Sequence, residues 1–131
     1  MNVLFVCNGN VARSQEAAIF FNDTSNLNYA QSAGVNVKAG KPIDPLVVSV
    51  MQELNYSMQD CYRKYADDSL INVADLVISF KPYSELPLAL QSHPNIRYWD
   101  VADPQHQSID FHREVRDSIK SKVDELVDEI G

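Results

Sequence analysis

The chain has 131 residues and carries 18 acidic against 11 basic side chains, for a net charge of −7. This length predicts one domain over residues 1–131, and the acidic balance argues against a nucleic-acid partner, which normally meets a basic face. No apolar run approaches the ~20 residues of a membrane span and no signal peptide is recognisable, so we expect a cytoplasmic protein without a membrane partner. Two cysteines, Cys7 and Cys61, are too few for a disulfide scaffold and do not have the spacing of a metal site. We therefore expect free thiols and neither metal nor cofactor.

Apolar and turn-forming residues succeed one another in a pattern typical of alternating strands and helices. The first half predicts a strand at 2–6, a helix at 14–21, a strand at 29–33 closed by Gly34, and a helix that begins with Asp44 as N-cap and Pro45 in its first turn. The second half predicts an irregular stretch at 55–70, a strand at 75–80, a short helix within 82–90, a strand at 96–99 and a long amphipathic helix over 111–130. This order predicts an α/β fold with a parallel sheet between helices, in which ligands bind beyond the carboxyl ends of the strands.

The segment VLFVCNGNVARSQEAA places Cys7 at the end of the first strand and Arg13 at the start of the next helix. A loop in this position points backbone N–H groups at a bound oxyanion, and the helix N-terminus adds positive charge. Arg13 can hold two oxyanion oxygens, and the positive surroundings favour the thiolate form of Cys7. Gly9 would allow close backbone approach, Asn10 tolerates a left-handed backbone, and Ser14 can donate a hydrogen bond to the thiolate.

The alternative interpretation is that Cys7 is a small core residue and Arg13 a solvated side chain of the first helical turn. A cysteine and an arginine six residues apart are only a moderate signal by themselves. Their placement on either side of a strand-to-helix loop favours the functional interpretation.

The same segment resembles the signature of the low-molecular-weight protein tyrosine phosphatase family, which includes the thioredoxin-type arsenate reductases. The likeness continues in SAG at 32–34 and in GKPIDPLVVSVMQEL, ADLVISF and WDVADP. The resemblance implies a three-layer α/β/α fold around a four-stranded parallel sheet. It also implies that Cys7 is the nucleophile, that Arg13 holds the phosphoryl oxygens, and that Asp103 of the Asp103–Pro104 pair is the general acid.

By the same resemblance, the remaining loop residues form the substrate-binding set: Asn8, Gly9, Asn10, Val11, Ala12 and Ser14. Within this set Asn10 would brace the loop and Ser14 would stabilise the thiolate. The implied reaction is thiolate attack on a phosphorylated protein or small phosphoester through a phosphocysteine, with Asp103 as acid and then as base. Asp100 is a rival acid, but it lacks a following proline and is interpreted as a loop or capping carboxylate.

Three functions remain open from the sequence. Phosphomonoester hydrolysis is favoured because nucleophile, arginine and acid are all present. Arsenate reduction is the alternative, because arsenate copies phosphate and because Trp99 and FHREVRDSIKSKV resemble the reductase branch. However, Lys81 stands where thioredoxin-coupled reductases have a relay cysteine, and Ala12 replaces a second loop cysteine. Reduction would therefore need an external thiol or Cys61. The third and least favoured function is a catalytically idle anion-binding module.

Further side chains are interpreted from their neighbours: Cys61 as a half-buried structural thiol, His93, His106 and His112 as surface or loop positions with His106 bordering the pocket, Tyr62 and Tyr65 as a helix-spaced packing pair, and Trp99 as an anchor of the fourth strand. The resemblance implies that Lys38 and Lys41 lie in the loop that flanks the active cleft, where they either attract an anionic substrate or are simply solvated. The aromatics of a phosphotyrosine slot are missing. Gln105 and His106 follow Pro104 where tyrosines are usual, and the segment 35–41 has no aromatic residue.

Overall fold

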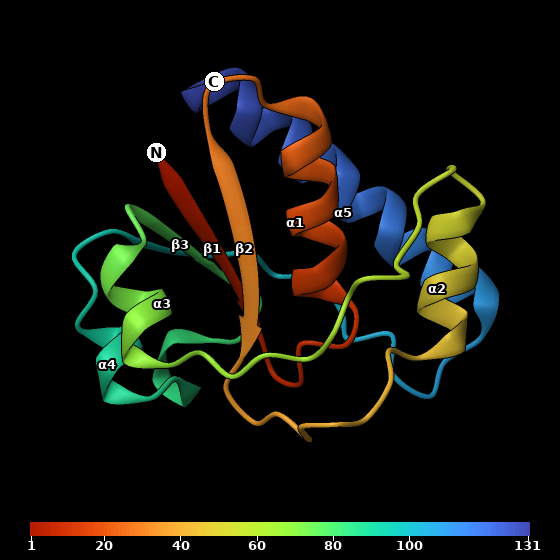
Figure 1. Ribbon diagram of the computed structural model, residues 1–131, viewed down its shortest axis with the longest axis horizontal. Helices are drawn as coiled ribbons and strands as arrows, with labels where there is room; N and C mark the ends of the chain where they lie inside the picture. Colours follow the sequence, from red (N-terminus) through yellow and green to blue (C-terminus); the bar gives the residue numbers. More distant parts are fainter.

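The computed structural model describes residues 1–131 as a four-stranded parallel sheet with helices on both faces (Figure 1). In chain order the elements are β1 (Asn2–Cys7), α1 (Arg13–Thr24), β2 (Tyr29–Gly34), α2 (Pro45–Gln52), α3 (Asp68–Val73), β3 (Leu76–Ser79), a 3-10 helix η1 (Tyr83–Glu85), α4 (Leu88–Gln91), β4 (Ile96–Tyr98) and α5 (Ile109–Ile130). The strand order is β2-β1-β3-β4. The predicted fold class, a three-layer α/β/α arrangement around this sheet, is confirmed.

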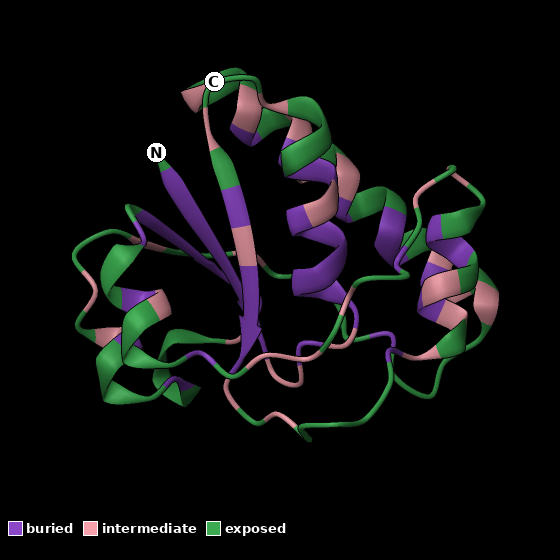
Figure 2. Cartoon of the chain, in the orientation of Figure 1, coloured by how far each residue is buried: buried purple, intermediate pink, exposed green.

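Strand β1 is buried along its whole length because helices cover both faces of the sheet. Val3, Phe5 and Cys7 belong to the core formed with α1, α2 and α5, whereas Leu4 and Val6 belong to the core formed with α3 and α4. This alternation is the two-residue period of a strand. Figure 2 shows β1 buried throughout, whereas the outer sides of the helices are exposed.

The helix boundaries differ from prediction where a tertiary contact stabilises the end. Helix α1 continues to Thr24, beyond the predicted end at residue 21, and Asn22 near that end exchanges two hydrogen bonds with the backbone of Ala30. The start of α2 is as predicted, since the Asp44 side chain accepts a hydrogen bond from the Leu46 N–H. None of the helices combines the length and apolar character that a bilayer crossing needs.

The interpretation of Tyr62 and Tyr65 as a helical packing pair is wrong. Both rings are exposed, and their segment is not helical. Backbone hydrogen bonds join it to the end of β2 instead: Gly34 donates to Lys64 and accepts from Ala66. The segment is thus fixed by pairing with the sheet and has no helical face to bury.

Ion pairs hold α2 against α5 beside the site. Glu53, which follows α2, accepts from Arg113 at 2.7 Å and from Arg116 at 2.7 Å. These hydrogen bonds, from Arg113 first and then Arg116, lower the pKa of Glu53 to about 2. Arg116 also donates to the Val50 carbonyl oxygen. The two helices are therefore joined by contacts to both backbone and carboxylate.

Glu16 is a fully buried carboxyl group on α1. Neither of its carboxyl oxygens has a hydrogen-bond partner. Burial raises the pKa of Glu16 to about 8, against the opposing effect of Arg116 on α5. The carboxyl group is therefore largely protonated at neutral pH, so the fold buries an acid rather than a charge.

This burial predicts that the Glu16→Gln protein keeps its stability as the pH rises, whereas the natural chain loses it. The folded chain holds the Glu16 proton up to about pH 8 and the unfolded chain releases it near pH 4.5. Between these values the free energy of unfolding should fall by up to ~1.4 kcal/mol per pH unit, because the unfolded state binds fewer protons. Urea unfolding of both proteins across this range measures the difference. Glu125→Gln, at an exposed position of α5, is the matched control. Parallel stability curves for the natural chain and Glu16→Gln would contradict the prediction.

Candidate active site

A cavity of about 660 Å³ lies at the carboxyl edge of the sheet. It is lined by the loop between β1 and α1, by the segment between β2 and α2, and by residues that follow β4. Strand β1 lies between β2 and β3, so successive connections leave the middle of the sheet in opposite directions. This is the switch point at which open parallel sheets bind ligands.

Cys7 ends β1 and lines the cavity, although only 3% of the residue is exposed. Its Sγ lies 2.9 Å from the Oγ of Ser14. Because that Oγ accepts a hydrogen bond from Asn10 Nδ2 at 2.8 Å, the hydroxyl proton of Ser14 is free to donate to the sulfur. The arrangement can stabilise a thiolate that has little contact with bulk water.

Asn10 braces the loop from behind. Its φ of 55° is the left-handed backbone that its residue type tolerates. Its Nδ2 also donates to Ser32, and its Oδ1 accepts from Gln15 and from the Lys64 backbone N–H. Every hydrogen-bonding position of this amide is thus used. Asn10 and Ser14 are fully buried and do not line the cavity.

The other residues of the predicted substrate-binding set do line the cavity: Asn8, Gly9, Val11 and Ala12. Helix α1 begins at this loop with Ala12 as its N-cap and therefore has no capping side chain, whereas α2, α3 and α5 each begin with a capping Asp or Ser. The first N–H groups of a helix have no acceptor within it. At α1 they remain available for an anion, and the helix dipole favours negative charge there.

Gly34, at the end of β2, is the glycine that the loop requires. A Cβ atom there would lie 2.8 Å from the Asn10 nitrogen and 2.8 Å from the Asn8 carbonyl oxygen, both of them backbone atoms. In the sequence, Gly34 is recognisable as the end of a strand and as part of the SAG motif, but its contact with the loop is not. Gly9, where the sequence predicts close backbone approach, does not have a positive φ.

Arg13, the first residue of α1, has a fixed and largely buried side chain. One guanidinium nitrogen donates to the carbonyl oxygens of Phe80 and Val101, at 3.2 and 3.0 Å. The other terminal nitrogen lies 3.6 Å from the carboxylate of Asp103. The alternative of a solvated arginine is wrong, since only 8% of the residue is exposed.

Asp103 lines the cavity, and its half-exposed carboxylate also accepts a hydrogen bond from the Gln105 backbone N–H. Asp100 does not line the cavity; its carboxylate accepts from the hydroxyl of Tyr98 at 3.3 Å. Of the two carboxylates considered as general acid, the structure therefore brings only Asp103 to the cavity that contains Cys7.

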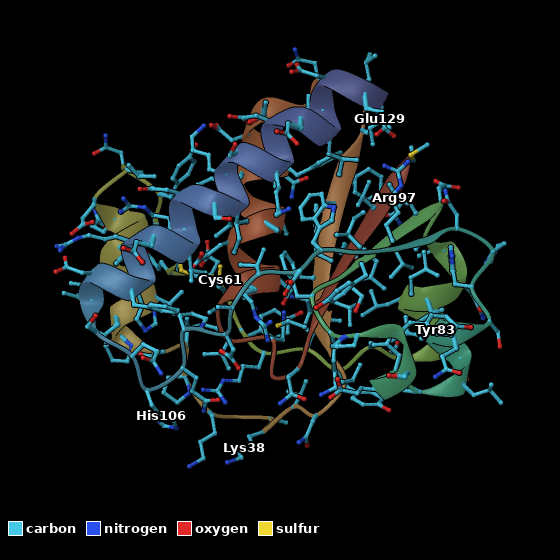
Figure 3. All side chains as sticks on the ribbon, turned by 180° about the vertical axis from the view of Figure 1, so that it is seen from behind. Lys38, Cys61, Tyr83, Arg97, His106 and Glu129 are labelled. Atoms are coloured by element: carbon cyan, nitrogen blue, oxygen red, sulfur yellow. The ribbon has the colours of Figure 1, made fainter.

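The cavity wall includes Lys38, Lys41 and His106, as the sequence predicts, and no Phe, Tyr or Trp side chain lines it. Figure 3 shows Lys38 and His106 at the same end of the molecule. The surface placement of His112 is wrong: it lines the cavity and only 1% of it is exposed. His112 lies one turn before Arg116 on the buried face of α5, which its polar neighbours in the sequence conceal.

Both cysteines are free thiols, and they lie in different surroundings. Cys61 is half-buried, its pKa is raised by burial, and it does not line the cavity. Lys81 takes the place that a relay cysteine would occupy, and its Nζ donates a hydrogen bond to Asn8 Oδ1 at 3.0 Å. Cys7 is thus the one thiol that lines the cavity, and Lys81, which follows β3, contacts the loop between β1 and α1.

Comparison with known proteins agrees with this geometry. The family model described as low molecular weight phosphotyrosine protein phosphatase matches residues 2–131. The chain is 25% identical to a protein-arginine-phosphatase of Bacillus subtilis (strain 168), over 99% of this chain and 97% of that protein. It is 26% identical to an arsenate reductase of Bacillus cereus (strain 03BB102), over 92% and 90%. The crystal structure of a low molecular weight protein tyrosine phosphatase from T. tengcongensis matches with a TM-score of 0.88 and 27% identity, over 99% of each chain.

The chain belongs to the low molecular weight phosphotyrosine protein phosphatase family, as its resemblance predicts. It is thus a member of a family of enzymes, and its relatives include both phosphatases and arsenate reductases.

Proposed function

We propose that this protein hydrolyses phosphomonoesters through a phosphocysteine intermediate. The observation that carries the proposal is that Cys7, Arg13 and Asp103 line one cavity, at the N-terminus of a helix that has no capping side chain. These groups supply the nucleophile, the oxyanion site and the proton donor. The substrate would be a phosphorylated protein or a small phosphoester.

In the first step the Cys7 thiolate attacks phosphorus, and the bond between phosphorus and the leaving oxygen breaks. The free N–H groups of the loop and the guanidinium of Arg13 stabilise the three remaining oxygens. Asp103, 3.6 Å from that guanidinium, gives its proton to the leaving oxygen. Meanwhile the hydroxyl of Ser14 loses its anionic partner as the sulfur–phosphorus bond forms.

In the second step Asp103, now a carboxylate, takes a proton from a water molecule that attacks phosphorus. The sulfur–phosphorus bond breaks, inorganic phosphate leaves, and the Cys7 thiolate regains its hydrogen bond from Ser14. The same carboxylate therefore acts as acid and then as base, which the half-exposed position of Asp103 allows.

Arsenate reduction is the competing function, supported by relatives named arsenate reductases. It requires a further thiol to attack the cysteine–arsenic adduct. Cys61 does not line the cavity and Lys81 stands in the relay position, so the chain would depend on a thiol supplied from outside.

One enzyme preparation tested for two reactions separates these functions. We expect it to release phosphate from an aryl phosphate, with competitive inhibition by vanadate, and to form no arsenite from arsenate and a small thiol above the buffer rate. Arsenite formation without phosphate release would overturn the proposal. Vanadate binding with neither reaction would instead indicate an anion-binding module.

A further inference from the structure

The cavity contains more positive charge than the proposed reaction uses. Although the chain is acidic overall, 4 of its 11 lysines and arginines line the cavity, against 2 of its 18 acidic residues. One of these two, Asp44, caps α2, and the other, Asp103, lies beside Arg13. The remaining cations are Lys38, Lys41 and Arg63.

Arg63 is held at the cavity wall with a donor left unused. Its guanidinium donates to the Pro42 carbonyl oxygen at 2.8 Å, which fixes it against the segment that contains Lys41. Its Nε is buried and has no hydrogen-bond partner. A buried N–H without an acceptor is costly and is rare in folded proteins. The residue lines the cavity, so the positive charge of its guanidinium is available to an anion bound there.

His112 adds a second unused donor on the same cavity. Both of its ring nitrogens are buried and without a partner. An imidazole has at least one N–H in any protonation state, so an unsatisfied donor is present whichever tautomer forms. Two side chains from distant parts of the chain, Arg63 and His112, thus lack an acceptor at one cavity.

The three cations also lack the carboxylate partner that most other basic residues of this protein have. No carboxylate lies within 4.0 Å of Lys38, Lys41 or Arg63, and neither lysine ammonium donates a hydrogen bond. By contrast, Arg97 forms an ion pair with Glu129 at 2.6 Å, and both are labelled in Figure 3. The unpaired positive charge on the wall is available to a ligand.

We propose that the substrate is a small phosphoester whose leaving group carries a second anion, a carboxylate or another phosphate, which binds Lys41 and Arg63. This inference depends on the proposed function for the role of the phosphoryl group. A cavity of about 660 Å³ can hold a small molecule, and its wall has no Phe, Tyr or Trp side chain to pack against an aryl group. An anionic leaving group would give these cations the partner that they lack.

The test uses two non-hydrolysable ligands that differ in one charge: para-carboxymethyl benzylphosphonate and its neutral carbamoylmethyl analogue. In calorimetric titrations at low salt we expect the carboxylate ligand to bind about three- to tenfold more tightly than the neutral ligand. This ratio of affinities should decrease as salt is added. The preference should fall toward one in Lys41→Met and in Arg63→Met. Arg63→Met also removes the hydrogen bond to Pro42 and could move the loop, whereas Lys41→Met removes a side chain that has no hydrogen-bond or ion-pair partner. A lost preference in Lys41→Met therefore reports the charge and not a rearranged loop. Lys122→Met, which removes a positive charge from α5 outside the cavity, should keep the preference.

Equal affinities of the natural chain for the two phosphonates would overturn the inference, as would a preference that persists in both Lys41→Met and Arg63→Met. Failure of both ligands to bind would overturn it as well. Hydrolysis of the matching phosphate esters is measured separately: a carboxylate preference in binding without turnover would reject the phosphatase and keep the anion subsite. A phosphopeptide with acidic flanking residues, hydrolysed more efficiently than the carboxylated ester, would overturn the assignment to a small molecule.

Discussion

The Cys7→Ser protein should fold and bind phosphate but release none from an aryl phosphate above background, a loss of at least about ten-thousandfold in kcat. A serine hydroxyl at this position has no adjacent base to activate it, since its neighbour Ser14 is itself a hydroxyl. The fold should persist because serine is similar in size and can still bond to Ser14. Steady-state assays with vanadate titration of the same sample measure both properties.

Cys61→Ser is the matched control, because it makes the same change at a thiol that does not line the cavity. It should keep the turnover of the natural chain. Rapid acid quenching adds a direct test, since phosphate should be found on sulfur in the natural chain and in Cys61→Ser but not in Cys7→Ser. If Cys61→Ser lost turnover while Cys7→Ser kept it, the nucleophile would not be Cys7 and the mechanism would be refuted.

The Asp103→Asn protein should lose about 10²- to 10⁴-fold in kcat, the usual contribution of a positioned general acid. The loss should be larger for phenyl phosphate than for para-nitrophenyl phosphate, because nitrophenolate leaves without needing a proton. Phosphate release measured with both esters, on the natural chain and on Asp103→Asn, gives the readout.

Asp100→Asn provides the comparison, because it neutralises the neighbouring carboxylate that points to Tyr98 and not to the cavity. It should change kcat little and keep the dependence on leaving group. If Asp100→Asn shows the larger loss and Asp103→Asn retains full activity, the acid has been assigned to the wrong residue.

Much of the sheet and its helices could be predicted because β1 and β3 are short apolar runs and because α2 begins with a recognisable capping residue, Asp44. The stretch between α2 and β3 was harder. Its backbone pairs with Gly34 at the end of β2, a contact across more than 25 residues that no local pattern reveals. Tyr62 and Tyr65 were misassigned for this reason.

The loop between β1 and α1 could be predicted as part of the candidate site because it is contiguous: Cys7, Arg13 and Ser14 lie within one turn and the helix that follows it. The cavity wall could not, because it is assembled from separated segments. His112 looks like a surface residue among charged neighbours, and only the packing of α5 shows that it is buried at the cavity. Arg63 likewise gave no signal in the sequence.

The hydrogen bonds of Arg13 affect which inactive variants are suitable for trapping the natural substrate of this enzyme. Its guanidinium is bonded to the ends of two neighbouring chain segments at Phe80 and Val101, so removing it would disturb the architecture around the pocket as well as its grip on a ligand. Bait proteins for such capture should therefore alter Cys7 or Asp103 and leave this arginine in place.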